Sequence, residues 1–254
     1  MLYFFIFLQH WAQEIVRRKG NRNSPFYSYL FVTLQLKFEI MNCLVVAATP
    51  IEISPFLERY RADRDLPLNI DILITGIGLT ATTYSLTRQL NIKRPDLIIQ
   101  AGVGGCFDNS VPLGAVLAIK QEAIADQSVI ELDRLRTMFH LKLVPQNQYP
   151  FSKGWLVNKS ELLKKVKLKK VKGISVNEIT TSKQKVKFYT ETFNPVVESM
   201  EGAALHYVCL MEKIPFVQIR SVSNYIAERN KKNWNMKESI NNLNNELINL
   251  LQQL

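Results

Sequence analysis

The sequence is poor in cysteine and histidine, with three of each among 254 residues. They stand far apart along the chain, at Cys43, Cys106, Cys209, His10, His140 and His206. No paired cysteine spacing occurs, which argues against a disulfide framework and against a cysteine-based zinc site. No H-x-x-x-H pair occurs either, so a metal enzyme is disfavoured. We therefore expect reduced thiols in the cytoplasm and no bound metal.

Long hydrophobic runs are also missing from residues 1–40, although this stretch is crowded with aromatic side chains. None of its apolar spans approaches the roughly 20 residues that cross a bilayer. It has no basic region before its apolar start and no clean cleavage site, so it is a poor signal peptide. A mistaken start codon, an extension that packs on the domain and a weak membrane-surface anchor all remain open. We favour the mistaken start, because the strand-like run 42–48 follows Met41 directly, and we expect the fold to comprise residues 41–254.

Acidic residues are too few to balance the lysines and arginines, and the formal net charge is +10. Much of the excess lies in 153–187, where Lys164, Lys165, Lys167, Lys169, Lys170 and Lys172 crowd together. Such a run could bind nucleic acid. It has few interleaved aromatics and no nucleic-acid motif, so a solvated basic surface is the favoured interpretation.

From Met41 onward, apolar runs of strand length alternate with helical patterns, which is typical of α/β layering. Strands are predicted over 44–48, 70–75, 96–100, 114–125, 173–176, 195–199 and 215–222. Helices are predicted after Thr49-Pro50 and over 79–90, 183–192, 201–211 and 234–254. Residues 129–172 have no clear pattern and are expected to form a variable excursion. Neither an internal repeat nor an interdomain linker is evident, which predicts one domain.

Two segments hold the most informative polar residues: Val197-Glu198-Ser199-Met200-Glu201-Gly202-Ala203-Ala204 and Arg220-Ser221-Val222-Ser223-Asn224. The first places Glu201 at the start of an apolar helix. The second brings Ser223 and Asn224 to the carboxyl end of a strand, where α/β proteins bind ligands. A carboxylate can accept hydrogen bonds from two vicinal hydroxyls, and a carboxamide can donate and accept at the edge of a base. The pattern therefore predicts a polyhydroxylated ligand that carries a heterocycle.

These two segments resemble the nucleoside phosphorylase and nucleosidase superfamily, and within it the methylthioadenosine/S-adenosylhomocysteine nucleosidase branch. The resemblance covers residues 41–254 and implies a single α/β domain with three layers, in which helices flank a central twisted mixed sheet. It also implies hydrolysis of the N-glycosidic bond of a nucleoside, a homo-oligomer and no organic cofactor. Within the branch the sequence looks most like the futalosine hydrolases, which release hypoxanthine from futalosine for menaquinone synthesis.

The resemblance assigns the two glutamates. Related nucleosidases place the glutamate that activates water in the turn after the first strand, a position held here by Glu52. The bland alternative is a first-turn glutamate that complements a helix dipole, and from that position we expect a lowered pKa and an ionised base. The Met-Glu pair of the family binds ribose, so Met200 is expected under the sugar and Glu201 at its 2′- and 3′-hydroxyls.

Asn224 departs from the pattern of adenine-releasing relatives, which carry aspartate after the serine. A carboxamide cannot protonate a base, but it can donate to O6 or N7 of a 6-oxopurine. We therefore expect Asn224, steadied by Ser223, to bind hypoxanthine. The alternative is an asparagine that merely caps a turn.

Glycines after the predicted strands would let backbone approach the ligand, and Gly102, Val103 and Gly104 are expected to line the site. Related phosphorylases hold phosphate here with arginine and threonine. Gln100 and Val103 cannot replace those contacts. Hydrolysis is therefore favoured over phosphorolysis, with a methylthioadenosine nucleosidase and a purine nucleoside phosphorylase as the alternatives. For the carboxylate on the 5′ side of futalosine, the basic candidates are Arg134, Arg136, Lys153 and Arg229.

Overall fold

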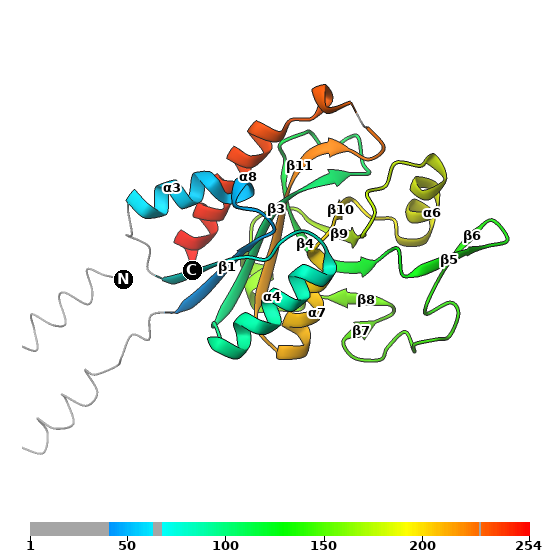
Figure 1. Cartoon of the computed structure of the whole chain (residues 1–254), viewed down its shortest axis with the longest axis horizontal. Helices are drawn as coiled ribbons and strands as arrows, with labels where there is room; N and C mark the ends of the chain where they lie inside the picture. Colours follow the sequence, from blue (N-terminus) through cyan, green and yellow to red (C-terminus); the bar gives the residue numbers. More distant parts are fainter. Residues whose placement is uncertain (1–40, 63–67, 229) are drawn as a thin grey trace, which may run out of the picture. The chain divides into compact units, whose positions relative to one another are not determined.

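The computed structural model describes residues 41–62, 68–228 and 230–254. The proposed extension or mistaken start, residues 1–40, lies outside this part of the chain. Strands and helices alternate in the order β1 Asn42–Ala47, η1 Pro50–Ile53, α3 Ser54–Ala62, β2 Asn69–Ile74, α4 Leu79–Ile92, β3 Leu97–Cys106, β4 Val116–Ile124, β5 Ser128–Glu131, β6 Arg134–Thr137, β7 Phe151–Ser152, β8 Trp155–Val157, α5 Glu161–Lys165, β9 Lys170–Ser175, α6 Lys183–Phe193, β10 Val197–Ser199, α7 Gly202–Glu212, β11 Phe216–Tyr225, η2 Lys231–Asn233 and α8 Met236–Gln253 (Figure 1).

A mixed sheet forms the centre of the fold, with strand order β2-β1-β3-β10-β9-β4-β8-β7. Strand β11 lies off this path and pairs parallel with β3 and antiparallel with β4. Because β10 and β9 connect β3 to β4 on the other side, these five strands close into a ring. The first strand, β1, is buried along nearly its whole length, as expected for a parallel strand covered on both faces.

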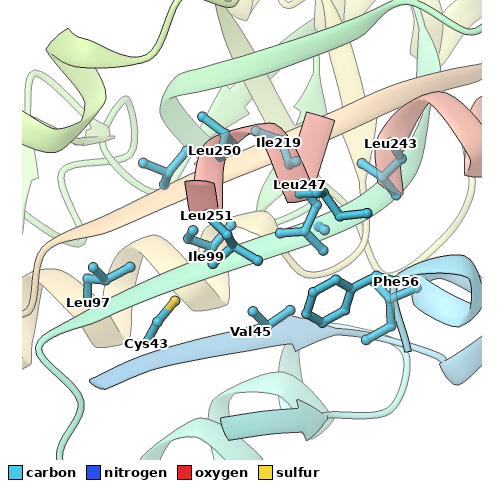
Figure 2. Close-up of a cluster of buried hydrophobic side chains, with 14 of the residues drawn as sticks. Cys43, Val45, Phe56, Leu97, Ile99, Ile219, Leu243, Leu247, Leu250 and Leu251 are labelled. Atoms are coloured by element: carbon cyan, nitrogen blue, oxygen red, sulfur yellow. The ribbon is translucent and has the colours of Figure 1, made fainter. Parts of the chain in front are cut away.

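Helices cover both faces of the sheet, so the predicted three-layer α/β architecture is confirmed. Helices α3 and α8 lie on one face, and α4 and α7 lie on the other (Figure 1). Figure 2 shows the leucines of α8 lying over β3 and β11, with Phe56 of α3 beside them. Leu243, Leu247 and Leu251 are fully buried there. Burial of one such side chain contributes about 1.5–3 kcal/mol, so the three leucines stabilise the packing of α8 against the sheet.

Strand β3 is longer than predicted, because the glycines after residue 100 continue the strand instead of forming a loop. Gly102 pairs with Arg220, and Gly104 pairs with Val222, both on β11. Their backbone groups therefore belong to the sheet ladder. Strand β9 of the same sheet begins at Lys170, three residues before the predicted start at residue 173.

The excursion over 129–172 has its own secondary structure. Strands β5 and β6 form a separate antiparallel hairpin, which projects away from the main sheet (Figure 1). Strands β7 and β8 form a second hairpin, and β8 joins the main sheet beside β4. In the described residues, no helix is both long and apolar enough to cross a membrane.

Candidate functional site

A cavity of about 330 Å³ lies where the ends of β1, β3, β10 and β11 come together. It is lined by Ala48, Thr49, Ile51, Glu52, Ile77, Val103, Gly104, Gly105, Ile179, Thr180, Glu198, Ser199, Met200, Glu201, Ser223, Asn224, Ile226, Ala227, Glu228, Trp234, Met236 and Ile240. The structure thus brings together seven of the eight site residues predicted from the sequence. Gly102, the eighth, is absent from the lining, but a Cβ atom added to it would meet the side chains of Arg220 and Glu52.

Glu52 lies on η1, the short 3-10 turn that follows β1 and leads into α3. Its Oε2 accepts hydrogen bonds from the Thr49 backbone N–H at 3.0 Å and from the Thr49 hydroxyl at 3.2 Å. Its Oε1 accepts from the Val103 N–H at 3.1 Å. These donors hold the carboxylate at the cavity wall, where the side chain is buried.

The expected lowering of the Glu52 pKa is wrong. Burial raises the pKa of Glu52, against the lowering effects of Arg220 and of the Val103 and Thr49 N–H groups. Glu201 raises it further, because two carboxylates near each other disfavour a second negative charge. The turn places Glu52 near a helix start, as predicted, but removal from water outweighs the local dipole. A raised pKa suits a base that must accept a proton.

Glu201 is the N-cap residue of α7 and is buried. Its Oε1 accepts a hydrogen bond from the Gly78 N–H at 3.1 Å. Its Oε2 lies 3.3 Å from Nη2 of Arg220, whose side chain is also buried. A buried carboxylate needs such a partner, so the ion pair explains how Glu201 is held in the wall.

Arg220 connects the polar groups behind the cavity, a role that was not predicted from the sequence. Besides Glu201, it donates to Oε1 of Gln100 at 3.1 Å and to the Val103 carbonyl at 3.4 Å. A side chain at Gly102 would collide with the guanidinium group and touch Oε1 of Glu52. Gly102 is therefore required for close packing at this point of β3. Gln100 and Val103, whose anion-binding ability was in question, serve here as partners of Arg220.

Asn224 lies near the end of β11, where the register with β3 shifts between Val222 and Asn224. Its Oδ1 accepts a hydrogen bond from the Ser223 hydroxyl at 2.9 Å, and its Nδ2 donates to the Tyr225 carbonyl at 3.0 Å. A carboxamide has two N–H donors and two acceptor lone pairs. One N–H and one lone pair of Asn224 therefore remain for a ligand in the cavity.

Several lining residues were not predicted, and Glu198 and Trp234 are the most informative of them. Glu198 belongs to the segment Val197–Ala204, in which only Met200 and Glu201 were predicted to bind the ligand. Burial raises the pKa of Glu198, although contacts with Thr180 lower it. Nothing in the local pattern marked Trp234, because it reaches the cavity through the approach to α8.

Basic side chains are missing from the described lining of the cavity, which includes the carboxylates Glu52, Glu198, Glu201 and Glu228. Arg134, Arg136 and Lys153, which were candidates for an anionic ligand group, lie on the hairpin excursion and outside the lining. Arg229 lies outside the described residues. Within the described residues, no group of three histidine, cysteine or acidic side chains could hold a metal ion. The three cysteines are free and buried.

The arrangement combines three buried carboxylates, a carboxamide and an apolar wall in one cavity. A carboxylate with a raised pKa can deprotonate a water molecule, while a second carboxylate can hold hydroxyl groups. The carboxamide can bind the edge of a heterocycle, and Ile226, Trp234 and Met236 can enclose an apolar part. These features suit a nucleoside-sized ligand.

Comparison with known proteins connects this chain to nucleosidases. It is 26% identical over 163 residues to 5′-methylthioadenosine/S-adenosylhomocysteine nucleosidase of Buchnera aphidicola, covering 61% of this chain and 66% of that protein. The matched part thus spans about two thirds of that relative. The chain is 24% identical over 218 residues to futalosine hydrolase of Thermus thermophilus, covering 83% of this chain and 95% of that protein.

A solved structure shows the same fold. The Helicobacter pylori 5′-methylthioadenosine/S-adenosylhomocysteine nucleosidase superposes with a TM-score of 0.71 at 18% identity, covering 85% of this chain and 99% of that one. The family model described as the phosphorylase superfamily matches residues 69–254. Since that match spans most of the sequence, the chain belongs to the phosphorylase superfamily.

Proposed function

We propose that this chain hydrolyses the N-glycosidic bond of a 6-oxopurine nucleoside, with futalosine as its substrate and hypoxanthine and dehypoxanthine futalosine as its products. The reaction class is supported by the two relatives described above, which are nucleosidases of two kinds with different substrates. The observation that carries the proposal is the placement of Glu52, Glu201 and Asn224 in one cavity.

In the proposed mechanism, Glu52 is the general base. It takes a proton from a water molecule that attacks the anomeric carbon as the sugar gains oxocarbenium character. Val103 and Thr49 supply N–H groups that orient the carboxylate, and the nearby Arg220 favours its ionised form. The raised pKa makes the carboxylate a stronger base than a solvated glutamate.

Glu201 and Met200 bind the sugar in this proposal. One oxygen of Glu201 is paired with Arg220 and the other with Gly78, so the carboxylate cannot rotate freely. Each oxygen retains a lone pair that can accept a ribose hydroxyl. Met200 precedes it in the wall and offers an apolar surface to the sugar.

Asn224 binds the leaving base through its remaining N–H, which can donate to O6 or N7 of hypoxanthine. Hypoxanthine leaves as an anion more readily than adenine does, so a hydrogen bond suffices where adenine requires a proton. This favours a 6-oxopurine over methylthioadenosine, the substrate named for the Buchnera aphidicola relative. Phosphorolysis is disfavoured because Gln100, Val103 and Arg220 bind one another instead of leaving a free anion site.

Futalosine carries a carboxylate on the 5′ side of its sugar. The described lining of the cavity offers no lysine or arginine to its carboxylate. Inosine has the same base and lacks this acidic group, so it is the discriminating comparison substrate.

The test is release of free base by the purified chain from futalosine, inosine and methylthioadenosine, with and without phosphate. We expect phosphate-independent release of hypoxanthine from futalosine. Faster release from inosine would indicate that the substrate is a simpler 6-oxopurine nucleoside. Adenine release from methylthioadenosine alone, or a strict need for phosphate, would contradict the proposal.

A homo-oligomer is part of the same proposal. Ile51 and Ile77 line the cavity yet are 69% and 61% exposed, and Tyr84 on α4 is 65% exposed. Large apolar side chains left open near a site commonly pack against another protein surface. Light scattering coupled to size-exclusion chromatography should give at least twice the monomer mass, and a monomer would contradict this part.

Nucleic-acid binding is the alternative from another class, and the lysine run gives it little support. Lys164 pairs with Glu161, and Lys170 donates to the Val166 carbonyl. Lys172 lies 5.4 Å from the centre of the Trp155 ring. These three lysines thus contact other groups of the same chain, as the side chains of an ordinary basic surface do. Salt-sensitive DNA or RNA binding that survives Glu201→Ala would favour the alternative.

A further inference from the structure

A buried polar cluster lies beneath the start of α7, outside the lining of the cavity, and the mechanism above does not use it. Strand β4 contributes Glu122, β11 contributes Gln218 and α7 contributes His206. Each of the three residues is 1% exposed or less. Nε2 of Gln218 donates to Oε1 of Glu122 at 3.0 Å, and Gln218 also lies against His206. Buried polar groups normally have hydrogen-bond partners, so each atom of this cluster has to be accounted for.

His206 is neutral and carries its proton on Nδ1. This nitrogen lies 3.0 Å from the carbonyl oxygen of Leu156, which can only accept a hydrogen bond. Burial lowers the pKa of His206 to about 4, although its contacts with Leu156 and Gln218 raise it. In a neutral imidazole the other nitrogen holds a lone pair. Nε2 of His206 is therefore an acceptor that needs a donor.

Two acceptor atoms of the cluster have no hydrogen-bond partner among the described residues: Nε2 of His206 and Oε1 of Gln218. Turning the carboxamide of Gln218 over exchanges its oxygen and nitrogen, and this supplies both missing bonds if Glu122 is protonated. The O–H of Glu122 then donates to Oε1 of Gln218, and Nε2 of Gln218 donates to Nε2 of His206. Burial raises the pKa of Glu122 to about 7, so the proton is present at acidic pH.

The cluster also contacts the turn that carries Glu201. Ser175 donates its hydroxyl to Oε2 of Glu122 at 3.2 Å and accepts from the Ala203 N–H at 2.8 Å. A Cβ atom added to Gly202, between Glu201 and Ala203, would collide with Oε1 of Glu122. Glu122 therefore packs directly against the backbone that sets the position of Glu201.

Arg220 is the cation of this region, and the nearby carboxylates compete for it. It forms the ion pair with Glu201, and it lowers the pKa of both Glu52 and Glu122. Glu201 raises the pKa of Glu122, because two negative charges near each other repel. Since His206 is neutral, Arg220 and Glu201 are the charged groups of β11 and α7 that act on Glu122. A neutral Glu122 leaves the guanidinium group to Glu201, whereas an ionised Glu122 competes for it.

We propose that Glu122, Gln218 and His206 form a relay that positions Glu201 for ribose: neutral Glu122 donates to Gln218, and Gln218 donates to His206. Arg220 then remains paired with Glu201. This inference rests on the proposed function, which assigns ribose binding to Glu201. When Glu122 loses its proton to solvent, the relay loses its first donor and Glu201 gains a negative neighbour. Glu122 is thus a positioning residue, and its ionisation should raise KM more than it changes kcat.

The kinetic test measures KM and kcat for futalosine and inosine from pH 6 to pH 8. KM of the wild type should rise about 5-fold over this range, as Glu122 becomes ionised next to Glu201. Glu122→Gln should have the same KM at pH 8 as at pH 6, because its amide stays neutral and still donates to Gln218. Glu161→Gln is the control on an exposed carboxylate and should follow the wild type.

A second measurement requires neither turnover nor a change at Glu122. Nuclear magnetic resonance of the full chain with ¹⁵N-labelled histidine reports the tautomer of His206. At pH 6 it should show a protonated Nδ1 and an Nε2 that accepts a hydrogen bond, and the Nε2 signal should shift as pH rises to 8. His10→Gln and His140→Gln assign the signals, because each removes one of the other two histidines.

Two results would overturn the inference. One is a His206 that carries its proton on Nε2 at pH 6, since that nitrogen could not accept from Gln218. The other is a KM that changes with pH in the same way in the wild type and in Glu122→Gln. A chain that hydrolyses neither nucleoside would contradict the proposed function instead, and the resonance measurement would still test the relay.

Discussion

Glu52 combines burial with three hydrogen-bond donors, and these two features have opposite effects on its charge. Removal from water favours the neutral acid, while the N–H groups and Arg220 favour the carboxylate. The balance raises the pKa. A base with a raised pKa holds an abstracted proton more strongly than a solvated glutamate would.

Glu52→Gln should lower kcat about 1,000-fold, since the amide cannot accept the proton. In the wild type, kcat/KM should fall as pH decreases through the raised pKa of Glu52, because protonation removes the base. Rates from pH 4 to 9 measure both effects. Glu58→Gln, an exposed change on α3, should leave the rate unaltered. A Gln variant that keeps its rate and its pH profile would rule out this role.

Asn224→Asp should shift the preference for the base. The carboxyl group can protonate adenine at N7, but it loses the N–H that faces a 6-oxopurine. We expect the ratio of kcat/KM for methylthioadenosine to that for the 6-oxopurine substrate to rise about 100-fold. The exposed Asn241→Asp change on α8 is the control. An unchanged ratio would mean that Asn224 serves only the turn through its bonds to Ser223 and Tyr225.

At the scale of elements, α8 positions the turn that carries Glu52. Asn244 of α8 is buried, and its Nδ2 donates to the Glu52 carbonyl at 2.9 Å. Its Oδ1 accepts from the Phe56 N–H at 3.0 Å. One side chain thus satisfies two backbone groups where η1 joins α3, a place at which helix ends leave such groups unpaired.

Asn244→Ala should destabilise the protein by about 3 kcal/mol, because two buried backbone groups lose their partner. It should also lower kcat, since the turn that holds Glu52 becomes looser. Urea unfolding and steady-state rates measure the two effects. Asn245→Ala, on the exposed side of the same helix, should change stability by less than about 0.5 kcal/mol. Equal effects of the two changes would contradict this account.

The pairing of β3 with β11 has a similar consequence for the site. It sets Gly102 beside Arg220, and only a glycine leaves room for the guanidinium group. The predicted loop glycines therefore act inside a strand. Their spacing was visible in the sequence, whereas their partner across the sheet was not.

At the scale of the whole molecule, a buried carboxylate lies beneath the site at the start of α7. Glu122 of β4 accepts hydrogen bonds from Gln218 at 3.0 Å and from Ser175 at 3.2 Å. Burial raises its pKa to about 7, although Gln218, Arg220 and Ser175 lower it. The folded chain therefore keeps a proton that the unfolded chain releases above its ordinary pKa of 4.5.

This proton makes stability depend on pH with a definite sign. Between about pH 4.5 and 7 the folded state binds more protons at Glu122, so the free energy of unfolding falls as pH rises. Glu122→Gln removes this dependence. Relative to the wild type, the variant should gain roughly 3 kcal/mol between pH 4 and pH 8. Gln218 can turn its unpaired Oε1 toward the new amide.

Urea unfolding at a series of pH values measures this difference, and the other titrating groups cancel between the two proteins. The exposed Glu161→Gln change should give a difference that does not vary with pH. A constant difference for Glu122→Gln as well would show that folding leaves the pKa of Glu122 unshifted.

The first forty residues also concern the whole molecule. The sheet, both helix layers and the cavity are built within the described residues from Met41 onward. We therefore predict that a chain beginning at Met41 folds and releases base at the rate of the full chain. Circular dichroism and the base-release assay measure this. A truncated chain that fails to fold would contradict the proposed domain boundary.

The sequence by itself determined the α/β alternation, most of the strands and helices, and the turn and helix start that carry Glu52 and Glu201. These features depend on local patterns, because an apolar run, a capping residue or a proline acts on its immediate neighbours. Asn224 could be singled out for the same reason, since it ends a strand.

Only the tertiary structure decided how these residues act together. Arg220 forms a hydrogen bond with Gln100 across 120 residues of sequence, and Glu52 forms one with Val103 across 51 residues. No local sequence pattern predicts these contacts. The pKa of Glu52 changed direction relative to its prediction, because the helix start is a local effect and burial is not. Glu198 and Asn224 lie on either side of Gly105 only because of the register of β3, β10 and β11. Desolvation and strand register are properties of the assembled fold, and they determine the partners of each polar group.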